Sequence, residues 1–428
     1  MAPDSDLKLT TDQISWFGSL FFVIIPVGCF LSGPFTHKFG RKSLMIWLCV
    51  PFFFAWLVFY YATSAALLYV AILLHGFING LLEAPILTYV AEVTEPKWRG
   101  MLSSSSVLAS LGGIFLEFLL GSWLPWRHAA LVNMIFPVVS FISICFIPES
   151  PHWLVGRGRT EDAEKSLRWL RGWCGPAAVS EELEGLVKTT LVKEGANEAE
   201  TPFTWDPYLH RGFLHPFALV IMSFFIGHFS GMSTLQTYAV SIFESLGSSG
   251  YISASAMGLC QLAGGLVCIC TLPCLGKRRL ALISTIGCGI CLLVLASTMD
   301  LPQMTPYASV GLLLAAVFLT NSCSKVFPWV LIGEVFSGRL RAVASGLASC
   351  VGYALGFLVN KTYFNLLSVL TLRGILFLYG GVSLVGAVLY YFLLPETEGR
   401  TLLEVQQHFS GERDLVKGKV NPSFTPDS

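Results

Sequence analysis

Eleven long apolar runs dominate this 428-residue sequence and limit what it can fold into. A helix that crosses a hydrocarbon layer of ~30 Å needs about 20 apolar residues, and it satisfies all of its backbone hydrogen bonds internally. Runs of that length lie near 14–34, 43–63, 67–91, 101–123, 128–147, 215–239, 252–273, 279–299, 307–335, 342–366 and 371–394. The sequence therefore predicts an all-α integral membrane protein that crosses the bilayer many times.

The composition agrees with this prediction and excludes several other classes of protein. Hydrophobic residues make up 54% of the chain and charged residues 13%, and the mean hydropathy is +0.66. The 27 basic and 27 acidic residues balance, so no charge excess predicts binding to nucleic acid or to an acidic partner. The lipid bilayer is the partner that the composition predicts, and no oligomeric state follows from it.

The twelve cysteines do not form a metal-binding pattern. Most lie inside apolar runs, where a thiol behaves as a small hydrophobic group. Cys268, Cys270 and Cys274 are close together, but no histidine or second cysteine pair completes a zinc site. The sequence also lacks an HExxH motif, a glycine-rich phosphate loop and a nucleophile with a paired base. We therefore expect no metal, no cofactor and no enzymatic activity.

The polar connections predict the orientation of the chain. The long segment 149–214 is rich in charge and is predicted to form amphipathic helices outside the bilayer. Basic residues at 37–42, in 149–214, at 276–279 and at 337–341 fall on one side if the helices alternate, and that side is expected to be cytoplasmic. The N-terminus then lies outside and the C-terminus inside.

The polar joints also repeat between the two halves of the chain. AEVTEPKWRGMLSS (91–104) is similar to GEVFSGRLRAVASG (333–346), with Glu-Val and then Arg seven residues after the Glu in both. FGRK (39–42) is matched by LGKRR (275–279), and IPES (147–150) by LPET (394–397). A parallel repeat predicts two bundles of similar design that rock against each other.

Taken in order, these motifs resemble one family. The residues that carry the resemblance are GPFTHKFGRK, AEVTEPKWRG, PESPHWL, SIFESLG, PWVLIGEVFSGRLR and PETEGRTL. They are similar to the sugar porters of the major facilitator superfamily, and most of all to the insect trehalose and glucose transporter branch. The resemblance covers nearly the whole chain.

The resemblance implies two helical bundles, here of five and six predicted transmembrane helices, joined by a cytoplasmic helical segment. The expected domains are the N-terminal bundle 1–148, the linker 149–214, the C-terminal bundle 215–397 and the cytoplasmic tail 398–428. In that family one more helix precedes the run that starts near Ile14. We therefore expect either an incomplete or alternatively started chain, or a slot that lipid or another subunit fills.

The implied function is facilitative transport of trehalose, glucose or a related small polar solute by alternating access. Proton-coupled members of the family keep their acid on the first helix, so facilitated diffusion is the simpler interpretation. The alternative is a transport-deficient protein that acts as a sensor, a binding protein or a degenerate paralogue. The charged linker and the inward tail favour the plasma membrane.

The resemblance also implies a cytoplasmic gate made of charged residues. Glu92 and Arg99 are two helical turns apart with Pro96 between them, so each must find a partner elsewhere. The expected gate residues are Arg41, Glu92, Arg99 and Glu149 in the first half, and Arg278, Glu334, Arg341 and Glu396 in the second. The alternative is that these charges are solvated helix ends that follow the positive-inside rule.

The expected substrate site departs from the family pattern. Gly227 and His228 stand where sugar porters have two glutamines before Ser-Gly, and Val107 stands at another glutamine position. The remaining candidates supply hydroxyl, amide and aromatic groups, which a polyhydroxylated ligand requires. They are His228, Ser233, Gln236, Tyr238, Gln261, Asn321, Trp329 and Tyr353.

Three ionisable residues lie within apolar runs: Glu83, Glu117 and Lys325. A charge in such a position is costly unless it is paired or faces water. Lys325 is expected either to pair with one of the two glutamates as a structural tie or to meet an anionic substrate.

Overall fold

The protein is described here from a computed structural model. The structure describes residues 7–95, 99–197, 211–336, 338–398, 402–410, 413–414 and 419–420. Within these residues, nine helices are long and apolar enough to cross a membrane, and Pro306–Asn321 is a shorter apolar helix. The nine long helices and Pro306–Asn321 together account for all eleven predicted runs, because the span Val343–Leu393 contains two of them. The prediction of a multi-pass, all-α membrane protein is confirmed.

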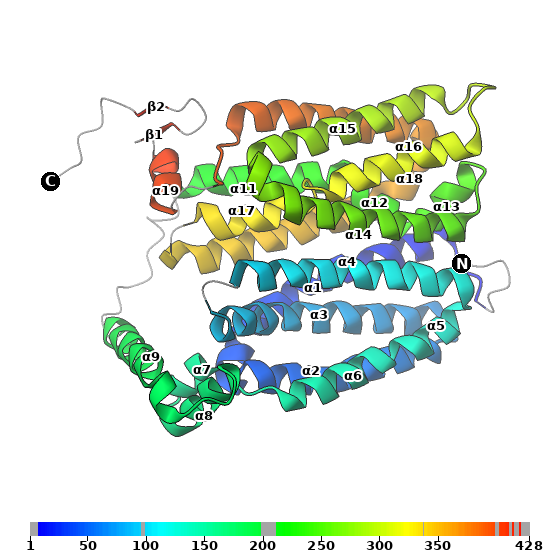
Figure 1. Ribbon diagram of the computed structural model, residues 1–428. Helices are drawn as coiled ribbons and strands as arrows, with labels where there is room; N and C mark the ends of the chain where they lie inside the picture. The colour runs from blue at the N-terminus through cyan, green and yellow to red at the C-terminus, as the bar shows by residue number, and fades with distance from the viewer. Residues whose placement is uncertain are drawn as a thin grey trace. The chain divides into compact units, whose positions relative to one another are not determined.

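The first half of the chain forms six helices before the linker (Figure 1). They are α1 (Thr11–Phe39), α2 (Arg41–Tyr60), α3 (Ala65–Val93), α4 (Arg99–Trp123), α5 (Trp126–Asn133) and α6 (Ile135–Phe146). Ser64 caps α3, because its hydroxyl accepts a hydrogen bond from the backbone N–H of Leu67. α5 and α6 together fill one predicted run, with an interruption at Met134.

The described residues of the linker form α7 (Pro151–Val155), α8 (Thr160–Leu170) and α9 (Pro176–Asn197). Ser150 caps α7 by accepting from the N–H of Trp153. The helices bury a small apolar cluster that includes Leu154, Val155 and Ala163. The linker is therefore helical, as predicted, and α8 is clearly amphipathic.

The second half has more numerous and more interrupted helices. They are α11 (Arg211–Phe229), α12 (Met232–Thr237), α13 (Ala239–Ser245), α14 (Gly250–Leu275), α15 (Lys277–Thr298), α16 (Pro306–Asn321), α17 (Phe327–Val335), α18 (Gly338–Leu393) and α19 (Leu402–Ser410). α18 is two helices joined at Thr371, whose φ of 60° is not helical. A two-residue antiparallel ladder, β1 (Arg413–Asp414) with β2 (Lys419–Val420), follows them.

The chain divides into two compact units. Unit 1 contains 23–106 and 125–204, and unit 2 contains 9–22, 107–124 and 205–428. α1 and α4 therefore each contribute to both units. The sequence-based domain boundaries stay a prediction.

Glycine allows a close helix contact in unit 1, where α1 meets α3. A Cβ on Gly28 would lie 2.4 Å from the carbonyl oxygen of Phe77, and a Cβ on Gly80 would lie 2.3 Å from that of Ile25. No side chain fits at either position, so the two backbones touch directly, as in other membrane helix pairs with small residues.

Two apolar cores lie among the described residues of unit 2. One contains Met232, Tyr238, Leu292 and Tyr379, and the other contains Phe224, Leu331 and Tyr390. α19 closes the second core with its buried Val405 and Phe409.

Candidate functional site

A network of charged residues joins α2, α3 and the start of α7 in unit 1. Arg41 Nη2 lies 2.8 Å from Glu92 Oε1, and the two side chains are only 16% and 18% exposed. The hydroxyl of Ser150 donates to the other oxygen of Glu92. Glu92 therefore pairs with Arg41 of the preceding helix.

Glu149 caps the N-terminus of α2. Its carboxylate accepts from the backbone N–H groups of Arg41 (3.0 Å), Lys42 (2.9 Å) and Ser43 (3.2 Å). Gly40 has a φ of 92°, and a Cβ there would lie 2.6 Å from Glu149 Oε2. The glycine thus leaves room for the carboxylate at the positive end of the helix dipole, where a negative charge is stabilised.

The same arrangement recurs in unit 2, at the start of α15. Glu396 accepts from the backbone N–H groups of Lys277 (3.0 Å) and Arg278 (3.2 Å). Gly276 has a φ of 79°, and a Cβ there would lie 2.7 Å from Glu396 Oε2. The repeat seen in the sequence is therefore also a repeat in hydrogen bonding.

Lys277, rather than the expected Arg278, pairs with Glu334. The ammonium of Lys277 bonds to Glu334 Oε1 and lies 2.9 Å from Glu398 Oε2. Thr397 donates to Glu334 Oε2 at 2.8 Å. Arg278 Nη2 instead donates to the carbonyl of Tyr391 at 2.6 Å.

The sequence held a signal for Lys277 that the motif comparison missed. Aligned on Gly40 and Gly276, Lys277 corresponds to Arg41; aligned on the Pro-Glu pairs 148–149 and 395–396, Thr397 corresponds to Ser150. The helix begins at the glycine, so the first residue after it points toward the glutamate on the neighbouring helix. Arg99 and Arg341 lie at described helical positions, but their side chains are outside the described part of the structure.

The linker is tied to the ends of α1 and α3. Trp153 Nε1 and Arg157 Nη2 donate to the carbonyl of His37, at 2.8 Å and 2.9 Å. Arg171 donates to the carbonyl of Val93 and to Glu182. The hydrogen bond to Glu182 raises the pKa of Arg171. Movement at these helix ends would therefore reach the linker directly.

Two of the candidate substrate-site residues have amide side chains that are completely buried yet retain hydrogen-bonding atoms without a partner among the described residues. Gln261 and Asn321 have no exposed surface. Both polar atoms of Gln261 and the oxygen of Asn321 lack a hydrogen-bond partner among the described residues. Gly264 of α14 contacts Asn321, so the two amides lie on adjoining faces of α14 and α16.

Gln236 and Asn321, two of the candidate substrate-site residues, lie where α12 meets the segment between α16 and α17. Asn321 Nδ2 is 3.6 Å from the sulfur of Met232, and Lys325 Nζ is 2.5 Å from Gln236 Oε1. His228 Nδ1 is 2.7 Å from the hydroxyl of Ser233. The structure thus brings Gln236, Asn321 and Lys325 to one contact between interrupted helices.

The aromatic candidates divide into two groups. Trp329 is 37% exposed and packs on Phe224 (5.0 Å between ring centroids) and Tyr353 (5.5 Å). Tyr238 is instead a core residue, which stacks on Tyr363 and donates to the carbonyl of Asn360. Trp329 offers a ring face to a ligand, whereas Tyr238 is engaged in packing.

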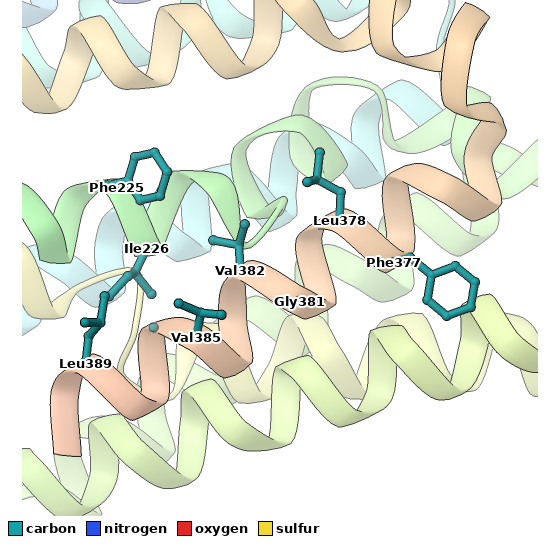
Figure 2. A pocket seen from close by; sticks show the side chains of 9 residues that line it. Phe225, Ile226, Phe377, Leu378, Gly381, Val382, Val385 and Leu389 are labelled. Carbon is teal, nitrogen blue, oxygen red and sulfur yellow. The ribbon is translucent and has the colours of Figure 1, made fainter. Parts of the chain in front are cut away.

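An apolar groove of about 400 Å³ lies between α11 and the second half of α18 (Figure 2). Nine residues line it, among them Phe225, Ile226 and Val382, and none of their side chains has a hydrogen-bonding group. A sugar would lose its hydrogen bonds to water there, so the groove suits hydrocarbon rather than a polar solute.

Comparisons with known proteins identify the relatives of this chain. The family described as "Sugar (and other) transporter" matches residues 2–409. The facilitated trehalose transporter Tret1 of Polypedilum vanderplanki is 28% identical over 425 residues, which cover 97% of this chain and 83% of that protein. Tret1 of Apis mellifera ligustica is 28% identical over 411 residues, covering 94% and 81%.

Solved structures match the fold. The inward-open xylose transporter XylE from E. coli aligns with a TM-score of 0.76 at 18% identity, over 92% of this chain and 89% of that one. The proton:xylose symporter XylE bound to 6-bromo-6-deoxy-D-glucose aligns with a TM-score of 0.72 at 19% identity, over 95% and 92%. The predicted fold of the major facilitator superfamily is confirmed.

Proposed function

Because the chain belongs to the family of sugar and other transporters, we propose that it carries trehalose, glucose or a related small polar solute across a membrane by facilitated diffusion. It is a multi-pass membrane protein and not an enzyme. The relatives support a carrier over the sensor alternative, since those described above are named as transporters.

One observation of the structure carries this proposal: the buried amides of Gln261 and Asn321, with three polar atoms that no described protein group satisfies. Leaving a buried polar atom unpaired costs about 1–3 kcal/mol, so such atoms are usually retained for a reason. Sugar hydroxyls both donate and accept, and they would satisfy an amide oxygen and an amide nitrogen alike. The exposed face of Trp329 would stack on the sugar ring.

We assign the two charge networks to the control of cytoplasmic access. Each joins the end of one helix to the start of another within its own unit, through Arg41 with Glu92 and Lys277 with Glu334. The side chains are largely buried, with Arg41 and Glu92 16% and 18% exposed and Lys277 and Glu334 9% and 27% exposed, so breaking a pair costs about 3 kcal/mol, a difference that two interconverting states can tolerate. Arg99 and Arg341 stay candidates for the same gate.

The first part of α1 makes the contact that we expect to break when the carrier opens on the side opposite the cytoplasm. Asp12 pairs with Lys361 at 2.8 Å, and the hydroxyl of Ser15 donates to the carbonyl of Lys361. The ammonium of Lys361 also lies 4.2 Å from the centre of the Trp16 ring. Outward access would require these contacts of unit 2 to break.

We further propose the plasma membrane as the location.

Uptake into liposomes containing the purified protein tests the function. Labelled trehalose and glucose should enter until the inside and outside concentrations are equal, and unlabelled sugar trapped inside should accelerate entry by exchange. A protonophore should change neither result, because no proton gradient is used.

Liposomes without protein provide the control. Uptake that stays at the level of these empty liposomes for both sugars would reject the carrier. Accumulation above equilibrium that a protonophore abolishes would replace facilitated diffusion with proton coupling.

A further inference from the structure

Two interrupted membrane-spanning segments of unit 2 meet at their interruptions. α11 ends at Phe229 and α12 begins at Met232, while α16 ends at Asn321 and α17 begins at Phe327. Met232 contacts Asn321, and Gln236, one turn further along α12, contacts Lys325. Meeting points of broken membrane helices are where transporters of many folds bind their solutes.

Lys325 places a positive charge at this meeting point. Its ammonium bonds to the neutral amide of Gln236, and within the described part of the chain no carboxylate forms an ion pair with it. Within unit 2, the structural tie to Glu117 is therefore not among the contacts of Lys325. A cation within an apolar segment costs several kcal/mol unless an anion compensates it.

The groups that surround the Lys325 ammonium are either positive or uncharged. α17 begins two residues after Lys325, so the positive end of its dipole adds to the ammonium charge. Ser233 and His228 are bonded to each other, and the free atoms of Gln261 and Asn321 are uncharged. The contact thus offers hydrogen bonds for hydroxyl groups beside a single uncompensated cation.

We propose that the transported solute is an anionic sugar derivative, whose carboxylate or phosphate group binds Lys325. This inference rests on the proposed carrier function and narrows its substrate class. The hydroxyl groups of the solute would bond to Gln261 and Asn321, while the ammonium neutralises the acidic group. A purely structural lysine would instead be expected to have an acid as its partner.

Transport assays with three labelled solutes test the charge preference. Purified protein in liposomes is given glucose, glucuronate or glucose 6-phosphate at equal concentration. We expect at least one of the two anions to enter tenfold faster than glucose, and the comparison of the anions tells carboxylate from phosphate. Glucose entering faster than both anions would overturn the proposal.

Variants of Lys325 assign the preference to this residue. Lys325→Gln should lower anion uptake at least tenfold more than it lowers glucose uptake, whereas Lys325→Arg should keep the anion preference. Lys188→Gln is the matched control, because it removes the same charge from the exposed surface of α9. Equal loss of anion and glucose uptake in Lys325→Gln, or an unchanged anion preference, would contradict the assignment.

A measurement of binding tests the preference for anions independently of whether the protein transports any solute. Thermal unfolding of the detergent-purified protein is measured with glucuronate, glucose 6-phosphate, glucose or no addition. An anion should raise the melting temperature of the wild type and of Lys325→Arg, even if no solute is transported. If neither anion raises it more than glucose does, the proposal is wrong whether or not Lys325→Gln folds.

Discussion

At the scale of single residues, the polar side chains of unit 2 separate into groups that stabilise the fold and groups that do not. Tyr238, Thr234 and Ser284 all have hydrogen-bond partners in the core. Gln261 has none for either polar atom among the described residues, although it is as deeply buried. A residue that costs stability in this way is expected to be useful in transport.

Gln261→Leu should therefore separate stability from function. The substitution removes an unpaired amide, so we expect unfolding to become more costly by about 1–2 kcal/mol. Sugar uptake should fall at least tenfold, which corresponds to about 1.4 kcal/mol of lost solute binding. Thermal unfolding and liposome uptake measure the two effects. Gln261→Asn, which keeps the amide, should retain part of the uptake; unchanged uptake in the leucine variant would remove Gln261 from the site.

Lys277 and Arg278 are adjacent basic residues with different tasks. Lys277 has a 9% exposed side chain between Glu334 and Glu398, so Lys277→Gln leaves two carboxylates without their cation. We expect a loss of about 3 kcal/mol in the free energy of unfolding. Arg278→Gln should cost about 1 kcal/mol, because it removes a hydrogen bond at an exposed position. Denaturant unfolding in detergent compares the free energies of unfolding of the two variants. If Lys277→Gln loses no more stability than Arg278→Gln, the pair of Lys277 with Glu334 is not stabilising.

At the scale of helices, the interruptions are built into the backbone. Gly231 has a φ of 88° between α11 and α12, and a Cβ there would lie 2.2 Å from Cδ2 of Tyr379. Glycine therefore allows both the turn and the close packing of Tyr379. Gly40 and Gly276 play a different part, because they admit a capping glutamate at the start of a helix.

Gly231→Ala should destabilise the protein strongly. The left-handed backbone costs about 1–2 kcal/mol for a residue with a side chain, and the collision with Tyr379 adds to this. We expect a melting temperature a few degrees lower, because a chain of this length loses about 1 °C for each kcal/mol of stability. Gly381→Ala is the control, because no atom lies within 4 Å of the added Cβ in its helix. A wild-type melting temperature for Gly231→Ala would mean that this turn tolerates a side chain.

At the scale of the whole molecule, alternating access requires that segments change partners. The unit boundary within α1 and α4 shows which parts of these helices pack with the second half of the chain. In α4, the carbonyl of Phe118 accepts from Ser255, and a Cβ on Gly258 would lie 2.9 Å from Cα of Phe115. In α1, the contacts with Lys361 are polar and partly exposed, and thus easier to break.

Locking α1 to α18 should therefore stop transport. We expect a short bifunctional thiol reagent to join Asp12→Cys and Lys361→Cys, whose native side chains are 2.8 Å apart. The exposed cysteines Cys145, Cys270 and Cys274 are first replaced by serine. Sugar uptake should fall at least tenfold on cross-linking and recover on reduction. Each single-cysteine variant, treated in the same way, is the control. Full uptake by the cross-linked protein would show that this contact need not open.

The sequence by itself determined the class and the spans of this protein. Hydrocarbon imposes a minimum length on apolar helices, and that length can be counted without knowing any tertiary contact. The repeat of FGRK and IPES as LGKRR and LPET likewise indicated two equivalent charge networks. Those features are local or periodic, which is why they could be predicted.

Only the tertiary structure decided how the individual side chains are used. That Lys277 rather than Arg278 meets Glu334 depends on where α15 begins relative to α17. That Tyr238 packs in the core while Gln261 keeps its polar atoms free depends on contacts with residues far away in sequence. Neighbouring positions on a helix point in different directions, so their roles follow from the packing of several helices and not from residue type.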